Sequence, residues 1–217
     1  MGTIWLLRHG QTTANAQEVI QGPRIDAPLS DLGVRQAASL GDALADRPIE
    51  AVYSSPLVRA RSTAEALVSR HQRRDATAKG QLAVQVVPEL YEMDYGAFIG
   101  RSYADIRDEM EQVLDAWRLG FVDQPFPGGE SALLAQTRIR PFAARLAETA
   151  QAQDVAVVAH GRINRVLIAT LTGAGLTRLE EFPQANASIT ELAVDGAVTV
   201  RRLNDTAHLS LATDAFS

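Results

Sequence analysis

Two apolar runs that each end abruptly in polar residues dominate the hydrophobic pattern of the chain. Residues 3–7 and 154–159 are short and apolar almost throughout, which is typical of strands buried on both faces of a sheet. Two further runs flank Asp195-Gly196, a dipeptide that favours the turn of a β-hairpin. The pattern predicts strands at 3–7, 51–53, 84–87, 154–159, 188–194 and 197–203.

Amphipathic segments with helix-start signals separate these strands. Ser30 precedes apolar positions at helical spacing, Ser55-Pro56 has the form of an N-cap followed by a first-turn proline, and Ser102 begins a further helix. Residues 131–151 are mostly helical in pattern, with Pro141 as a point where the helix bends or divides.

The order of these elements predicts an α/β fold. Strands that alternate with helices and then close in a hairpin favour a three-layer αβα sandwich with a mixed, mostly parallel sheet and a C-terminal β-hairpin. No shift in composition marks a domain boundary, so we expect a single domain over residues 1–217. Within it, residues 204–217 are expected to form an extended C-terminal tail.

Composition narrows the class of protein. The chain has 217 residues, 46% of them hydrophobic, which is enough for a sizeable core. A net charge of −5 argues against nucleic acid or an anionic membrane as partner. The absence of cysteine excludes disulfides, thiolate metal sites and thiol nucleophiles. The N-terminal run is too short for a signal peptide or a membrane span, so a cytoplasmic protein is expected.

Candidate chemistry lies where three predicted strands end. These ends carry Arg8-His9-Gly10, Ser54-Ser55 leading to Arg59, and His160-Gly161. A single histidine or arginine in such a place is more often a packed or solvated residue. If the three strands are neighbours in a sheet, however, their carboxyl ends bring two arginines and two histidines together. Such a group favours an anion, and phosphate above others.

Six segments, in this order and spacing, resemble the histidine phosphatase (phosphoglycerate mutase-like) superfamily over nearly the whole chain. The segments are LLRHGQTTAN, PLSDLGVRQA, VYSSPLVRARSTAEAL, LYEMDYG, PGGES and VAHGRINRVL. Length and C-terminal sequence are similar to those of α-ribazole phosphatase-like and broad-specificity bacterial phosphatases.

The resemblance implies a catalytic set. His9 is then the nucleophile that forms a phosphohistidine, while Arg8, Arg59 and His160 hold the phosphoryl oxygens, His160 as a cation or donor. Glu92 matches the general acid that protonates the leaving oxygen and later activates water. Its acidic neighbours in the same segment, Glu89 and Asp94, are alternatives for this role.

The resemblance also implies a substrate site. Asn15, Gln21, Gly22 and Gly161 are expected to bind the phosphate or the substrate. The expected substrate is a small phosphorylated metabolite, with no metal and no cofactor. No feature of the sequence indicates an oligomeric state.

Two segments depart from the family pattern. Phe98 and Ile99 replace a common tryptophan and acidic residue, which would make the mouth of the pocket more apolar. Arg162 stands where a small residue is common, and would either add a cation near the substrate or face solvent.

The length of the segment after Glu92 distinguishes the alternative functions. Mutases of this family carry a longer insertion with extra basic residues after the acid segment, whereas only about thirty residues separate Gly96 from Pro127 here. A less covered site admits water to the phosphohistidine, so phosphomonoester hydrolysis is preferred. The alternatives are a cofactor-dependent phosphoglycerate mutase and a non-catalytic phosphate-binding protein on the same fold.

Overall fold

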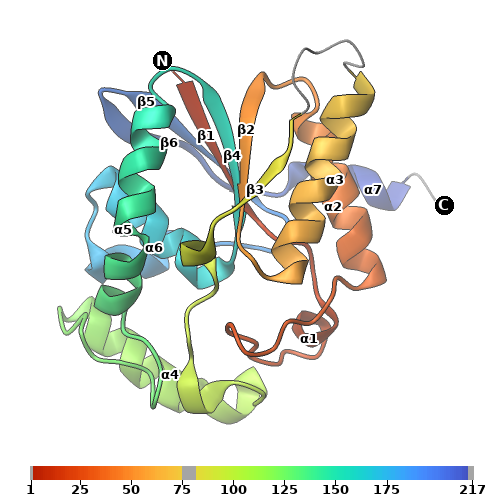
Figure 1. Cartoon of the computed structure of the whole chain (residues 1–217). Coiled ribbons are helices and arrows are strands. Elements are labelled where there is room, and N and C mark those ends of the chain that lie inside the picture. The colour runs from red at the N-terminus through yellow and green to blue at the C-terminus, as the bar shows by residue number, and fades with distance from the viewer. Residues whose placement is uncertain (1, 75–81, 215–217) are drawn as a thin grey trace.

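The computed structural model describes residues 2–74 and 82–214 (Figure 1). Within these ranges, six strands form one sheet in the order β3-β2-β4-β1-β5-β6. The strands from β3 to β1 are parallel, and β5 and β6 add two antiparallel pairings. The strands are β1 (Gly2–Arg8), β2 (Ile49–Ser54), β3 (Val84–Val86), β4 (Asp154–Ala159), β5 (Ile189–Asp195) and β6 (Ala197–Asp205).

Helices cover both faces of this sheet, as Figure 1 shows, with α2, α3 and α7 on one side and α5 and α6 on the other. The predicted three-layer α/β sandwich with a C-terminal hairpin is confirmed. The helices are α1 (Thr13–Ala16), α2 (Asp31–Leu44), α3 (Val58–Arg74), α4 (Tyr103–Arg118), α5 (Ala132–Thr149), α6 (Gly161–Thr172) and α7 (Ala207–Asp214). Three short 3-10 helices are η1 (Pro88–Leu90), η2 (Gly96–Phe98) and η3 (Leu176–Glu181).

The buried strand β1 divides its side chains between two hydrophobic clusters. Trp5 and Leu7 pack in the cluster that includes α2 and α3, whereas Ile4 and Leu6 pack in the larger cluster that includes α5 and α6. This alternation follows from the period of two along a strand. Burial on both faces fixes the register of β1 and therefore the position of whatever follows it.

Two helices differ in detail from the sequence prediction. Helix α3 begins at Val58, two residues later than predicted, because both carboxylate oxygens of Asp26 accept hydrogen bonds from the Val58 N–H at 2.9 and 3.0 Å. Helix α5 runs through Pro141, which lies on its exposed face. There the carbonyl that proline leaves without a helical donor can meet water.

The C-terminal segment is not extended where it is described. Asn204 and Asp205 complete β6, and α7 then packs against α2. Residues 215–217 of the expected tail lie outside the described residues. In the part of the chain that the structure describes, each helix is too short or too polar to cross a membrane.

Candidate active site

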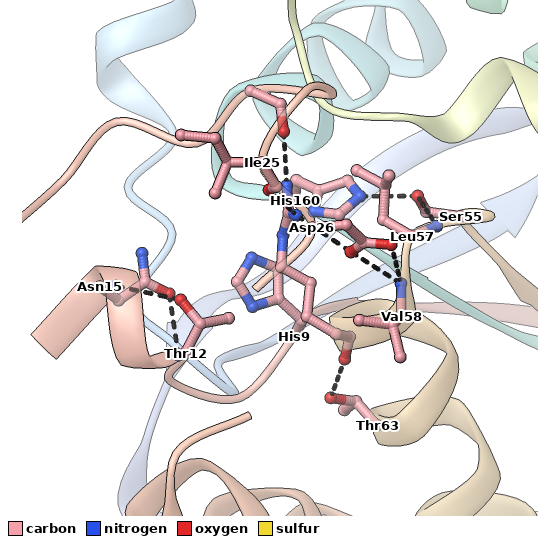
Figure 2. Close-up of polar contacts among 12 residues, drawn as sticks. His9, Thr12, Asn15, Ile25, Asp26, Ser55, Leu57, Val58, Thr63 and His160 are labelled. Carbon is pink, nitrogen blue, oxygen red and sulfur yellow. Dashed lines mark hydrogen bonds and ion pairs between the residues drawn. The ribbon is translucent and has the colours of Figure 1, made fainter. Parts of the chain in front are cut away.

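The carboxyl ends of three neighbouring parallel strands meet at one edge of the sheet. His9 follows β1, His160 is the N-cap of α6 directly after β4, and Arg59 lies in the first turn of α3 after β2. The imidazole rings of His9 and His160 lie with their centroids 5.1 Å apart (Figure 2). All three side chains are buried. The sheet order therefore brings together the histidines and Arg59, which the sequence places far apart.

Hydrogen bonds fix the orientation of His9. Its Nδ1 lies 2.7 Å from the Gly10 carbonyl oxygen, which can only accept, so Nδ1 donates and Nε2 keeps its lone pair in the neutral ring. The carbonyl of His9 accepts from Asn186 Nδ2 at 3.2 Å and from the Ala187 N–H at 3.0 Å. The Gly10 N–H donates to Thr63 Oγ1 at 3.1 Å. The backbone on both sides of the ring is thus tied to other elements.

Electrostatics favour the neutral form of both histidines. Burial lowers the pKa of His9 well below its ordinary value of 6.5, and the charges of Arg8 and Arg59 lower it further. Burial likewise lowers the pKa of His160 well below 6.5, with Arg59, His9 and Arg8 acting in the same direction. A buried neutral imidazole with a free lone pair is a competent nucleophile at neutral pH.

His160 is held by a serine. Its Nε2 lies 2.6 Å from Ser55 Oγ, and that oxygen already accepts the Leu57 N–H at 3.3 Å (Figure 2). If the Ser55 hydroxyl donates to Nε2, Nδ1 of the neutral ring carries the proton. The role of His160 toward a phosphoryl group, as a cation or donor, stays a prediction.

Backbone carbonyls hold the two arginines. Arg8 Nη1 donates to the Gln184 carbonyl at 2.6 Å, and Arg59 Nη2 donates to the Gly22 carbonyl at 2.8 Å. Arg59 Nη1 lies 3.5 Å from Asp26 Oδ1. Since carbonyl anchors carry no full charge, the Arg8 guanidinium group keeps most of its positive charge for another anion, whereas Arg59 shares part of its charge with the exposed Asp26 carboxylate.

Three buried nitrogens of this cluster have no hydrogen-bond partner among the described residues: Arg8 Nε, Arg59 Nε and His160 Nδ1. A buried donor without a partner costs about 1–3 kcal/mol, so such groups are rare in folded proteins. Two guanidinium groups and an imidazole donor suit an anion with several oxygens, and phosphate has that form.

Glu92 joins the cluster from the loop between η1 and η2. Its Oε1 accepts from the Met93 N–H at 2.8 Å and the Ile163 N–H at 3.1 Å, and its Oε2 accepts from the Arg162 N–H at 3.3 Å. The carboxylate therefore lies at the N-terminus of α6, next to His160. It is buried, unlike Glu89 and Asp94.

The amide of Asn15 is oriented by its neighbours. Oδ1 accepts from the Thr12 N–H at 3.1 Å and from Asn186 Nδ2 at 3.2 Å, so the NH₂ group is the end available to a ligand (Figure 2). Asn186 also donates to the carbonyl of His9. Asn15 and the candidate nucleophile thus share one anchor.

The other predicted binding residues surround the arginines. The carbonyl of Gly22 holds Arg59, and Gly161 begins α6 where an added Cβ would lie 3.4 Å from the Arg8 guanidinium carbon. Gln21 is buried, and its Oε1 lacks a hydrogen-bond partner among the described residues. The structure places Gly22 as a support of Arg59.

Four positioning contacts lie outside the residues that the sequence assigned to the site. They come from Asp26, Ser55, Gln184 and Asn186. Ser55 stood at a strand end, which was a usable signal, although the sequence indicated only a helix cap there. The other three lie in loops whose conformation no local pattern predicts.

The residues that depart from the family pattern, Phe98, Ile99 and Arg162, lie in different surroundings. Phe98 is fully buried against Phe126, so it does not line the mouth of the site. Ile99 lies against Gly22, where an added Cβ would lie 2.8 Å from its Cδ1. The Arg162 side chain is mostly buried and forms an ion pair with Glu180, so it does not face solvent.

In residues 2–74 and 82–214, no three histidine, aspartate or glutamate side chains come together in a way that could hold a metal ion.

Comparison with known proteins identifies the family of the chain. The model of the histidine phosphatase superfamily (branch 1) matches residues 4–206. Adenosylcobalamin/alpha-ribazole phosphatase of Escherichia coli is 33% identical over 170 residues, covering 78% of this chain and 79% of the relative. A 2,3-bisphosphoglycerate-dependent phosphoglycerate mutase of Rhizobium meliloti is 33% identical over 177 residues, with coverage of 78% and 79%. The structure of mycobacterial glucosyl-3-phosphoglycerate phosphatase with VO3 superposes with a TM-score of 0.80 at 29% identity, covering 95% of this chain and 100% of that one.

Proposed function

The chain belongs to branch 1 of the histidine phosphatase superfamily, and from this premise we propose that it hydrolyses small phosphate monoesters through a phosphohistidine at His9. One observation carries the proposal. The Gly10 carbonyl accepts a hydrogen bond from His9 Nδ1–H, so Nε2 keeps the lone pair that acts as nucleophile, in a buried cluster with Arg8 and Arg59.

In the first step, His9 Nε2 attacks phosphorus and the bond from phosphorus to the ester oxygen breaks. Protonated Glu92 gives its proton to that oxygen, and the alcohol leaves. The Gly10 carbonyl stabilises the positive charge that develops on the ring through the Nδ1–H. Arg8 and Arg59 bind the equatorial phosphoryl oxygens, because fixed cations stabilise the charge of phosphoryl transfer.

In the second step, water attacks the phosphohistidine. The Glu92 carboxylate takes the proton of the water, the new P–O bond forms, and the P–N bond breaks. The lone pair returns to Nε2, inorganic phosphate leaves, and Glu92 is again protonated for the next cycle. Dividing the displacement in this way replaces one difficult step by two easier ones.

The substrate class follows from the relatives. They include an adenosylcobalamin/alpha-ribazole phosphatase and a glucosyl-3-phosphoglycerate phosphatase, which supports a small phosphorylated metabolite as the substrate of this chain. We expect the protein to work without a metal or cofactor, since the arginines and histidines of the site supply the charge and the donors.

The test is turnover of p-nitrophenyl phosphate and of a panel of natural phosphate esters, with and without a chelator. We expect turnover that the chelator leaves unchanged, and a phosphoenzyme whose label is acid-labile and alkali-stable. Absence of turnover of every ester would refute the proposal, and would favour a phosphate-binding protein on this fold.

A mutase is the second candidate, because a phosphoglycerate mutase is among the relatives at 33% identity. It would interconvert 2- and 3-phosphoglycerate when primed with the bisphosphate, without release of phosphate. We expect phosphate release to exceed interconversion, because the segment between Gly96 and Pro127 is short for a mutase.

A further inference from the structure

A partly buried ion-pair cluster lies at the start of α6, next to Glu92. The Glu180 carboxylate on η3 bridges two arginines of α6: its Oε1 pairs with Arg162 Nη1 and its Oε2 with Arg165 Nη1. Burial alone raises the pKa of Glu180, but the two arginines outweigh burial and lower it below the ordinary value. Glu180 is therefore charged at neutral pH and holds both guanidinium groups.

Arg162 connects the ion-pair cluster to Glu92. The side chain of Arg162 binds Glu180, while the main-chain N–H of Arg162 donates to Glu92 Oε2 at 3.3 Å. The next N–H along the helix, that of Ile163, donates to Glu92 Oε1 at 3.1 Å. The first turn of α6 thus sets the direction of the carboxylate, and Glu180 holds that turn against η3.

Tyr95 adds a second connection. Its hydroxyl bonds to the Arg162 side chain, and burial followed by the charge of Glu92 raises the pKa of Tyr95 to about 12. The hydroxyl stays protonated and neutral at working pH. Since Tyr95 lies three residues after Glu92, the guanidinium group of Arg162 binds both the loop that carries the carboxylate and its counter-ion Glu180.

A second ion pair on η3, between Arg178 and Glu181, is an exposed surface pair and serves as a comparison. Arg178 and Glu181 are each 54% exposed and three residues apart on the surface, where such a pair contributes little to stability. The Arg162 and Glu180 side chains are 12% and 29% exposed, and they connect two elements beside the reacting groups. A pair of this kind acts on geometry as well as on stability.

We propose that Glu180 is a positioning residue, which acts through Arg162 to orient the Glu92 carboxylate toward the oxygen of the leaving group. The proposal rests on the function argued above, in which Glu92 is the general acid. Substituting Glu180 removes the counter-ion of Arg162, leaves Tyr95 as its remaining side-chain partner, and loosens the turn that holds Glu92, while His9, Arg8 and Arg59 keep their own anchors.

The effect therefore depends on the leaving group. The p-nitrophenolate ion is a good leaving group and departs without a proton, whereas an alkoxide must be protonated as it leaves. Where a proton is needed, general acid catalysis raises the rate roughly 10²- to 10⁴-fold. A purely structural loss would lower turnover of both kinds of ester by the same factor.

The experiment compares Glu180→Gln with wild type and with Glu181→Gln as the matched control. We expect kcat/KM of Glu180→Gln for glycerol 2-phosphate to fall at least about tenfold, and that for p-nitrophenyl phosphate to change less than about threefold. Glu180→Asp should recover part of the loss, and Glu181→Gln should match wild type for both esters. Equal losses for the two esters, or no loss for either, would overturn the proposal.

Amide hydrogen exchange tests the same proposal without turnover. The N–H groups of Arg162 and Ile163 are protected by Glu92, so they should exchange faster in Glu180→Gln and unchanged in Glu181→Gln. Unchanged protection at both amides would overturn the positioning role even if the wild-type enzyme turned over no ester. Failure of the proposed function, by contrast, appears in the wild-type assay alone.

Discussion

The imidazole rings of His9 and His160 lie edge to face, with their centroids 5.1 Å apart and their planes at 61° (Figure 2). Arg8 and Arg59 act on both rings, and each ring is buried. Protonating either imidazole therefore adds a third positive charge to a cluster with little solvent. The folded protein resists that protonation, and the unfolded chain does not.

This relationship predicts how stability depends on pH. The pKa values of both histidines are lowered in the folded state, so below pH 6.5 the unfolded chain binds more protons than the folded protein. The free energy of unfolding should fall as pH drops below 6.5, by up to about 1.4 kcal/mol per pH unit for each histidine. Urea unfolding between pH 5 and 7.5 measures the slope.

The matched variants for this slope are His9→Gln and His160→Gln. Each should remove the contribution of one histidine, up to about 1.4 kcal/mol per pH unit between pH 5 and 6.5, above the range in which carboxylates titrate. His208, whose pKa burial also lowers, contributes a slope that both variants retain. If the free energy of unfolding of both variants depends on pH as steeply as that of wild type, the lowered pKa values of His9 and His160 are contradicted.

Replacing the nucleophile should abolish turnover and leave the fold intact. We expect His9→Ala to lower kcat by roughly 10⁴- to 10⁶-fold, the order seen when a covalent nucleophile is removed. Labelled substrate should no longer form a phosphoenzyme. Retained labelling would place the nucleophile elsewhere, and binding of inorganic phosphate measured by calorimetry shows whether the site is still formed.

Asp26 should matter for activity as well as for stability. It caps α3 through the Val58 N–H and lies beside Arg59, so Asp26→Ala should cost about 0.5–2 kcal/mol of unfolding free energy. It should also lower kcat/KM roughly five- to tenfold, because Arg59 loses one of its anchors.

Ser102→Ala is the control for Asp26→Ala. Ser102 Oγ caps α4 by accepting the Asp105 N–H at 3.2 Å, so its loss should destabilise the protein by a similar amount. Its kcat/KM should stay at the wild-type value. If both variants lose activity equally, Asp26 acts through stability alone.

Gly96 should tolerate no side chain. Its φ is +55°, and an added Cβ would lie 2.1 Å from the Pro127 carbonyl oxygen, so Gly96→Ala should cost more than about 3 kcal/mol in thermal or urea unfolding. Gly128→Ala, in the same contact region, has φ +68° and no atom within 4 Å of the added Cβ. It isolates the backbone strain, about 1–2 kcal/mol. Equal losses would show that the contact between the two loops is not tight.

The parts of this fold that follow local rules could be predicted from sequence. The strand before His9 and the strand before His160 are both apolar runs, and Ser30 and Ser102 are the observed helix caps. The cap of α3 could not be predicted in this way, because it comes from Asp26, 32 positions before the residue that it caps.

The same distinction holds for the site. The family motifs contain His9, Arg59, Glu92 and His160, and the structure brings these residues together. Asn186, by contrast, donates to the His9 carbonyl across 177 positions, from a loop with no regular pattern. Supports of this kind depend on loop conformations, which the packing of the whole chain decides.

The sheet order also has a consequence for synthesis. β1 precedes the other strands of the sheet along the chain, yet both of its partners, β4 and β5, lie beyond residue 153. During translation, which adds roughly 5–20 residues per second, β1 with its two unpaired edges must wait while most of the chain emerges. His9, the proposed nucleophile, is therefore translated well before the strands that position it, and a nascent chain cut before β5 carries His9 without the complete sheet.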